Sequence, residues 1–316
     1  MRVLVTGGAG FIGSHVVDAL CDEGSDVTVL DNLTTGRATN VDRRARLVQG
    51  SILDADLVDK EVEAADEVFH LAAAVGVRHI VDHPLESLRT NIRGTEHVLD
   101  ASARHGRRVL MASTSEVYGK SPAVPWREDD DRVLGSTAVP RWSYATAKAL
   151  DEHLALAHAS SGLQVTIVRY FNSYGPRLDE RGYGSVVAKF IGQALAGEPI
   201  TVHGSGAQTR CFTYVADTVT GTLLAARSPD AEGRVFNLGT ERETSIRELA
   251  ELVVEVTASS SRIEAVSYES EYGARFEDAP RRLPDTTRAR TILGWAPQVD
   301  LEDGLARTLA WWTSRG

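Results

Sequence analysis

Short apolar runs rich in β-branched residues alternate with longer amphipathic stretches over the first half of the chain. A continuous apolar run bounded by polar residues is typical of a strand that is buried on both faces of a sheet. The predicted strands are Val3–Thr6, Asp26–Leu30, Leu47–Gln49, Glu67–Leu71, Val109–Ala112 and Gln164–Arg169. The predicted helices are Gly13–Glu23, Leu85–His105 and Tyr144–Ser160. This alternation predicts an α/β fold with a doubly wound parallel sheet.

The regular alternation ends near Phe171, and a second region with more loops follows. Gly175-Pro176 and Gly204-Ser205-Gly206 mark two of these loops. Because no Pro-rich linker or low-complexity tract separates the two regions, we expect two closely joined lobes. The predicted first lobe is residues 1–170 with a return segment at about 213–239, and the smaller, mixed α/β lobe is 171–212 and 240–316.

Three helix signals lie in the second lobe. Ser245 and Glu248 have the spacing of a capping box and precede an apolar run, which predicts a helix start. Gly294 predicts the end of another helix. Residues 305–312 predict a closing helix, in which we expect the Trp311-Trp312 pair to pack against the core.

The composition is that of a soluble globular chain. Its 316 residues carry 44 acidic and 34 basic side chains, so the net charge of −10 argues against nucleic acid as a partner. The amino terminus lacks the apolar segment of a secretory signal, and no apolar run is long enough to span a membrane. The two cysteines, Cys21 and Cys211, have no metal-ligand spacing and predict no metal site. We expect a reducing compartment, the cytoplasm.

A glycine-rich turn joins the first predicted strand to the first predicted helix, with glycines at positions 7, 10 and 13. Gly7 allows a tight turn, Gly10 lets the backbone approach a pyrophosphate, and Gly13 permits close packing of helix on strand. Asp31 ends the second strand, where a carboxylate binds an adenosine ribose and repels a 2′-phosphate. The combination predicts a Rossmann-type fold that binds NAD, although Arg37 leaves NADP open.

Tyr144 and Lys148 are four residues apart near the start of a predicted helix, so their side chains share one face. A tyrosine with its ordinary pKa of about 10 is a poor base at neutral pH. A nearby ammonium and a positive nicotinamide ring stabilise the phenolate and lower the pKa of the tyrosine. We therefore expect Tyr144 to be the catalytic base and Lys148 to be its activator.

With these motifs the chain resembles the extended short-chain dehydrogenase/reductase family, which comprises NAD-dependent nucleotide-sugar epimerases, dehydratases and decarboxylases. The resemblance covers nearly the whole chain. Further matching motifs are His70-Leu71-Ala72-Ala73, Asn91-Ile92-Arg93-Gly94-Thr95, Arg169-Tyr170-Phe171-Asn172, Tyr174-Gly175-Pro176-Arg177, Thr213-Tyr214-Val215-Ala216-Asp217 and Pro284-Asp285.

The resemblance implies functional residues in both lobes. The expected NAD contacts are Gly7, Gly10, Phe11, Ile12, Gly13, Asp31, Asn32, Ser51, Ile52, Leu71, Ala72, Ala73, Tyr144 and Lys148. The expected contacts to a nucleotide sugar are Asn172, Arg177, Arg210 and Arg282 in the second lobe. Guanidinium groups suit a diphosphate. The family also implies a homodimer, built through the helices predicted at 85–105 and 144–160.

Thr114, Ser115 and Glu116 favour one family reaction over the others. The two hydroxyls suit a hydrogen bond to a sugar oxygen. A 4,6-dehydratase of this family carries Asp-Glu after the threonine, whereas this chain has Ser115-Glu116. A hexuronic acid oxidised at C4 loses carbon dioxide without a carboxylate base at C5. The chain therefore looks most like UDP-glucuronate decarboxylases, which yield UDP-4-keto-pentose or UDP-xylose.

One position departs from that pattern. These decarboxylases carry an arginine where this chain has Ser185, so we expect Arg177 or Arg181 to replace its charge. The main alternative is a 4-epimerase, although epimerases have a small or apolar residue in place of Glu116. A dehydratase and a non-catalytic NAD-binding protein are further alternatives, and the latter conflicts with the retained Tyr144 and Lys148.

Overall fold

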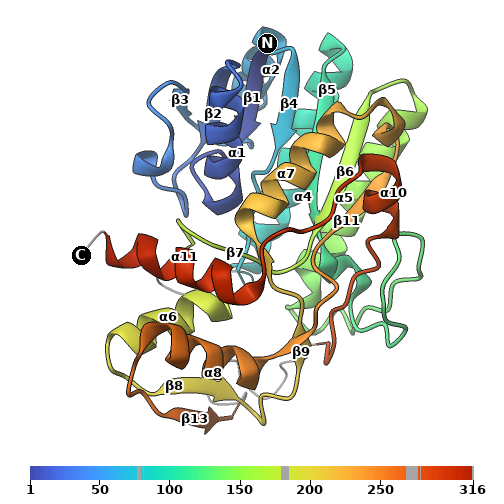
Figure 1. Ribbon diagram of the computed structural model, residues 1–316. Coiled ribbons are helices and arrows are strands. Elements are labelled where there is room, and N and C mark those ends of the chain that lie inside the picture. The colour runs from blue at the N-terminus through green and yellow to red at the C-terminus, as the bar shows by residue number, and fades with distance from the viewer. Residues whose placement is uncertain (77–79, 81, 179–184, 268–276, 278, 315–316) are drawn as a thin grey trace.

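Seven parallel strands form the central sheet of the computed structural model, which describes residues 1–76, 80, 82–178, 185–267, 277 and 279–314 (Figure 1). The strand order is β11-β6-β5-β4-β1-β2-β3, and every neighbouring pair is parallel. The strands are β1 (Arg2–Thr6), β2 (Asp26–Asp31), β3 (Arg46–Gln49), β4 (Glu67–His70), β5 (Arg108–Thr114), β6 (Val165–Tyr170) and β11 (Val235–Leu238). The predicted doubly wound sheet is confirmed.

Helices cover both faces of this sheet. They are α1 (Phe11–Asp22) and α7 (Val215–Arg227) on one face, and α2 (Ala55–Ala64), α4 (Pro84–His105) and α5 (Trp142–Ser160) on the other (Figure 1). Successive side chains of a strand point to opposite faces, and Val3 and Val5 accordingly pack with α1 and α7 whereas Leu4 packs with the other helices. The sequence pattern missed α2, which buries only Val58, Glu61 and Val62.

The strand order reverses between β1 and β4, and their carboxyl ends lie side by side, with Thr6 level with His70. The crevice outside such a reversal is where open α/β sheets bind their ligands. Gly7, which follows β1, therefore lies at the binding edge of the sheet.

The second lobe is a smaller α/β layer below the main sheet (Figure 1). Strands β8 (Ile200–His203) and β13 (Ile263–Val266) are parallel, and three helices pack with them: α6 (Val186–Leu195), α8 (Ile246–Thr257) and α11 (Leu301–Thr313). Short two-residue pairs complete it, namely β7 (Ser173–Tyr174) with β10 (Thr213–Tyr214) and β9 (Thr209–Arg210) with β12 (Thr244–Ser245).

The helix signals predicted for the second lobe are confirmed. Ser245 and Glu248 form a complete capping box at the start of α8. Gly294 ends α10 (Thr287–Leu293) with φ = +65°, a conformation that favours glycine. The closing helix begins earlier than predicted because Asp300 caps it, accepting a hydrogen bond from the Asp303 amide at 2.8 Å. In it Trp312 packs partly buried against the core.

The two lobes share one hydrophobic core. Val5 of β1, Phe190 of α6 and Leu249 of α8 belong to the same buried cluster. Both cysteines are free and buried in the structure. Among the helices that the structure describes, none is long and apolar enough to cross a membrane, and the described His, Cys, Asp and Glu residues form no group that suits a metal ion.

Candidate active site

The glycine turn packs directly against the segment that follows β4. Gly7 has φ = +73°, and a Cβ there would lie 2.7 Å from the backbone of Ala72. A Cβ on Gly13 would clash with the carbonyl oxygen of Gly7. The amide of Leu71 donates to the Thr6 carbonyl at 3.1 Å and holds the neighbouring segment in place. Only glycine fits both turn positions, as a dinucleotide-binding turn requires.

The amino terminus of α1 offers positive potential to an anion. Gly10 precedes the helix and supplies no capping side chain, and the first turn, which the structure describes in full, holds no acidic residue. This chain therefore leaves the helix dipole uncompensated there. The turn that contains Phe11 and Ile12 fits a pyrophosphate.

Asp31 is fixed at the end of β2 by two backbone amides. Its carboxylate accepts from Ala9 at 3.0 Å and from Leu33 at 2.8 Å. A carboxylate has about four acceptor positions, so two remain for the hydroxyls of a ribose. Together with the glycine turn, this donor and acceptor set fits NAD.

The other expected cofactor residues lie around the same edge of the sheet. Asn32 is exposed and accepts from the Thr34 amide at 3.1 Å, and Ser51 follows β3. Ile52 is buried beneath Gly94 of α4, where a Cβ would clash with the isoleucine side chain. Ala73 continues the segment after β4. The cofactor contacts of these residues remain predictions.

Tyr144 lies in the first turn of α5 and is 9 % exposed. Burial, together with the negative charges of Glu116 and Asp151, raises the pKa of Tyr144. In the protein alone these effects outweigh the Lys148 ammonium, and the expected lowering of the Tyr144 pKa by the ammonium and the nicotinamide ring together stays a prediction. The Lys148 ammonium instead donates to Asp151 at 2.8 Å.

The end of β5 carries the three residues expected to face the sugar. Thr114 caps the short helix η2 (Ser115–Tyr118), and its hydroxyl oxygen accepts from the Glu116 amide at 3.2 Å. The Thr114 hydroxyl therefore keeps its proton available for another acceptor. Ser115 is buried beside it.

Glu116 lies between two arginines from distant parts of the chain. Its Oε1 is 3.4 Å from Arg282 Nη1 and 3.5 Å from Arg141 Nη2, whereas its Oε2 is buried and has no hydrogen-bond partner among the residues that the structure describes. The sequence analysis missed Arg141, which directly precedes α5 and is 4 % exposed. Its position three residues before Tyr144 was the available signal. Two guanidinium groups thus lie beside one carboxylate close to the expected base.

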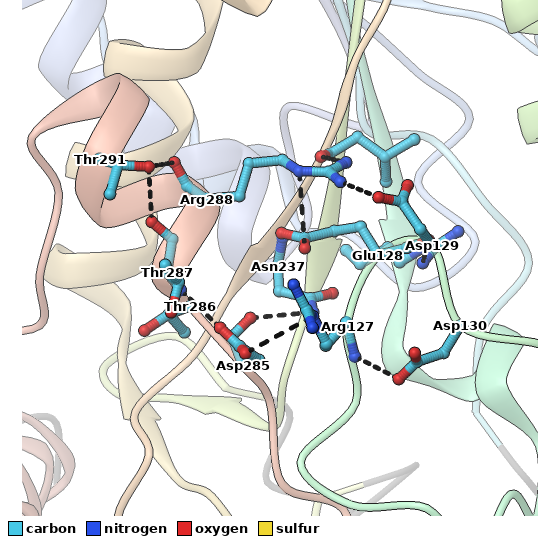
Figure 2. Close-up of polar contacts among 12 residues, drawn as sticks. Arg127, Glu128, Asp129, Asp130, Asn237, Asp285, Thr286, Thr287, Arg288 and Thr291 are labelled. Carbon is cyan, nitrogen blue, oxygen red and sulfur yellow. Dashed lines mark hydrogen bonds and ion pairs between the residues drawn. The ribbon is translucent and has the colours of Figure 1, made fainter.

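Figure 2 shows a polar cluster in which residues 127–130 meet residues 285–291, which continue the segment that follows Arg282 in the sequence. Trp126 pairs with this segment through two backbone hydrogen bonds of 2.8 Å, to Leu283 and from Asp285. Figure 2 shows Glu128 between Asn237 of β11 and Arg288 of α10; its carboxylate accepts from the Asn237 amide at 2.9 Å and is 3.7 Å from Arg288 Nε. The loop after β5 is thus attached to the carboxyl-terminal segment at the site.

The remaining expected substrate residues do not converge on Glu116. Asn172 has φ = +33°, and its buried Oδ1 has no hydrogen-bond partner within the described part of the chain. Arg210 is buried on β9 and donates to the Thr209 carbonyl at 2.7 Å. Arg177 pairs with Asp18 of α1 at 2.7 Å, so its charge is committed to the first lobe.

Ser185 caps α6, accepting from the Ala188 amide at 3.5 Å. This role suits serine and leaves that position without a positive charge. Arg181, the other expected replacement for the missing arginine, lies outside the described residues.

Comparisons with known proteins agree with this geometry. The model of the NAD dependent epimerase/dehydratase family matches residues 3–239. A UDP-N-acetyl-alpha-D-glucosaminuronate decarboxylase from Bacillus cytotoxicus is 44 % identical over 98 % of this chain and 97 % of its own length. UDP-glucuronic acid decarboxylase 1 from Danio rerio is 38 % identical over 99 % of this chain and 72 % of its own.

The solved structure of a UDP-glucose 4-epimerase from Thermotoga maritima with UDP-glucose superposes with a TM-score of 0.92 at 35 % identity, covering 100 % of this chain and 99 % of that one. Sequence and structure thus point to one family across the whole chain. The protein belongs to the NAD-dependent epimerase/dehydratase family.

Proposed function

We propose that this protein is an NAD-dependent UDP-glucuronate decarboxylase, which oxidises C4 of the sugar and releases carbon dioxide to give UDP-4-keto-pentose or UDP-xylose. The observation that carries the proposal is the single carboxylate of Glu116 between Arg141 and Arg282, beside Tyr144. The alternative within the family is a 4-epimerase, supported by the likeness to the Thermotoga maritima epimerase.

The first step requires a base at O4 of the sugar. The glycine turn and Asp31 would hold NAD, which would supply the hydride acceptor for C4. Tyr144 takes the O4 proton, which leaves a ketone at C4 once the hydride has gone, and Lys148 lies one turn further along the same helix. Thr114 and Ser115 hold the sugar oxygen through their hydroxyls. General acid–base help of this kind contributes about 10²- to 10⁴-fold to a rate.

The second step requires a place for the sugar carboxylate. The 4-ketone makes a hexuronate a β-keto acid, whose C5–carboxylate bond breaks as the ketone takes up the electron pair. Arg141 and Arg282 provide guanidinium donors for that carboxylate, which compensates for Ser185. Because Ser115 stands where a dehydratase has an aspartate, this chain lacks one of the two carboxylates that dehydration uses.

The uridine diphosphate is assigned to the second lobe. We propose that Asn172 and Arg210 contact the nucleotide portion and that residues 1–170 with 213–239 hold NAD. The unsatisfied Oδ1 of Asn172 supports a ligand there, because buried polar atoms normally have partners. We propose that Arg177 contributes to the site indirectly, through its ion pair with Asp18 of α1.

The relatives support decarboxylation and suggest two hexuronates. The Danio rerio relative is named for UDP-glucuronic acid, and the Bacillus cytotoxicus relative for an N-acetylated hexuronate. We propose UDP-glucuronate as the substrate and include the N-acetylated sugar as a competitor in the assay.

The deciding experiment incubates the purified protein with NAD and each UDP-hexuronate and analyses the products by mass spectrometry. The decarboxylase loses the mass of carbon dioxide from UDP-glucuronate. A product of unchanged mass that co-elutes with UDP-galacturonate identifies the epimerase instead. Glu116→Gln is expected to lower the rate of carbon dioxide release by about 10-fold or more with less effect on KM, because the uridine diphosphate is held elsewhere.

We also propose that the protein acts in the cytoplasm as a homodimer built on α4 and α5. Leu85 at the start of α4 and Leu150 on α5 are large apolar side chains exposed in the single chain, which supports an interface there. The two free thiols, Cys21 and Cys211, support a reducing compartment. Sedimentation that shows only monomer would contradict the dimer.

A further inference from the structure

Asp151 lies three residues after Lys148 on α5 and is completely buried. Its Oδ2 accepts from the Lys148 ammonium at 2.8 Å, and the lysine side chain is 3 % exposed. Removing one partner of a buried ion pair leaves an uncompensated charge. The protonation state of Lys148 is therefore tied to a residue that the proposed reaction does not otherwise use.

Buried hydrogen bonds near this pair link α4 to the glycine turn through His70. The Thr95 hydroxyl of α4 lies 3.0 Å from Nε2 of His70. On the other side of the ring, Nδ1 of His70 is 2.8 Å from the Thr6 hydroxyl. The Thr6 oxygen accepts from the Ala72 amide at 3.3 Å. These bonds join α4, β4 and β1 across the sheet edge.

His70 is uncharged in the folded protein. Burial and the charge of Lys148 lower the pKa of His70 to about 3, so its ring is neutral and carries one proton. His70 therefore adds no second charge beside the Lys148–Asp151 pair.

Other charged groups surround the Lys148–Asp151 pair without replacing it. Glu116 of η2 faces Tyr144. Glu152, the next residue of α5, is paired with Arg169 of β6. An ammonium has three donors, and the bond to Asp151 uses one, which leaves two for hydroxyl groups of a bound cofactor.

We propose that Asp151 is a positioning residue that keeps Lys148 charged and fixes its ammonium group on α5 through their buried ion pair. The physical reason is desolvation, because a buried lysine without a carboxylate partner gives up its proton more easily. The proposal depends on the proposed function in one respect only, namely that Lys148 assists Tyr144 as the catalytic base.

The first test observes the lysine directly in the NAD-loaded protein. The chain has four lysines, Lys60, Lys120, Lys148 and Lys189, so ¹³Cε-lysine labelling gives a simple spectrum. The Lys148 signal is assigned from a Lys148→Met sample. In the wild type this signal keeps its ammonium chemical shift between about pH 6 and 9, whereas in Asp151→Asn it moves to the neutral-amine shift within that range.

The second test measures the pH dependence of turnover. Asp151→Asn is expected to lower kcat by about 10-fold or more at pH 7 with KM changed less than about 3-fold. The acid limb of its kcat profile moves upward by about one pH unit, because Tyr144 loses the ammonium that favours its phenolate. A purely structural role lowers kcat equally at every pH.

Glu152→Gln is the matched control. It removes the neighbouring buried carboxylate of the same helix, one bound to Arg169 instead of Lys148. It is expected to lower stability but to leave the Lys148 signal and the acid limb in place.

Three outcomes overturn the proposal: an unchanged Lys148 signal in Asp151→Asn, a parallel loss of kcat at all pH values, or the same shift in Glu152→Gln. If Asp151→Asn does not fold, the wild-type spectrum decides, since a Lys148 signal that titrates below about pH 8 also overturns the proposal. If UDP-glucuronate gives no product, the proposed function fails, but the lysine spectrum still tests Asp151.

Discussion

Arg282 reaches Glu116 across 166 positions of the chain, with 3.4 Å between Nη1 and Oε1. Glu116 follows a central strand, whereas Arg282 belongs to the segment that pairs with Trp126. The charge around Glu116 therefore depends on how the carboxyl-terminal segment sits on the first lobe. A change in that pairing alters the site without touching a catalytic side chain.

Tyr144→Phe removes the proton acceptor and keeps the ring. We expect kcat to fall at least about 10²-fold, because burial leaves no room for solvent to take over the role. NAD is expected to stay bound, which absorbance of the purified protein checks. Tyr170→Phe is the control, since it also removes a buried hydroxyl but one bonded to Thr222. Turnover near wild type in Tyr144→Phe would mean that another residue is the base.

Arg141→Met tests which group receives the sugar carboxylate. Losing a charged hydrogen bond is expected to weaken UDP-glucuronate binding by about 10-fold or more. UDP-glucose has no carboxylate, so its affinity is expected to change less than about 3-fold. Titration calorimetry with both ligands makes the comparison. An equal loss for the two sugars would assign Arg141 to the fold or to the nucleotide.

Arg169→Met tests the buried ion pair at the sheet. Arg169 donates to Glu152 at 2.6 Å and 2.9 Å and also to the Tyr118 hydroxyl at 2.8 Å. The variant leaves the Glu152 carboxylate buried without its charged partner, which is expected to lower the free energy of unfolding by about 3–5 kcal/mol. Arg307→Met, which breaks an exposed pair with Asp303, is expected to lower it by less than about 1 kcal/mol. Urea unfolding of both variants checks the contrast.

Because of His70, we expect the folded protein to lose stability in acid. Its pKa of about 3 in the folded protein is below the ordinary value of about 6.5, so the unfolded chain binds the extra proton between these values. The neutral His70 ring contributes fully to the free energy of unfolding above about pH 6.5. This free energy falls as the pH drops toward 3, and the loss is about 2 kcal/mol at pH 5. In His70→Gln the decrease in the free energy of unfolding between pH 7 and pH 5 is expected to be smaller than in the wild type by this amount. Equal losses in urea unfolding would contradict the assignment.

The central sheet and the glycine turn were predictable because their signals are local. Six strands follow from β-branched runs, and the turn at Gly7 follows from residue types within one short segment. Helix α2 was not predictable in this way, since half of its ten residues are charged and only three of the ten are buried. Its position is set by packing against the sheet, which a local pattern does not contain.

The site was predictable in its residues and less so in its electrostatics. Tyr144, Lys148 and Glu116 follow from spacing and resemblance. The roles of Arg141 and Asp151 depend on which side chains meet after folding. Their only local signal is that each lies within three residues of Tyr144 or Lys148. The raised pKa of Tyr144 in the protein alone was not foreseen, because the sequence shows the nearby ammonium but neither the burial of the phenol nor the carboxylates of Glu116 and Asp151.

The path of the chain between the lobes has a consequence for how such proteins diversify. Along the chain, α6 and β8 of the smaller lobe come before β11, which is an edge strand of the large sheet. Helix α8 of the smaller lobe comes after β11. Exchanging the smaller lobe between relatives therefore requires two separate insertions, before α7 and after β11. A single recombination junction would leave one sheet without its edge strand. New substrate ranges in this architecture are accordingly reached by replacing side chains and loops, while the interwoven scaffold is inherited whole.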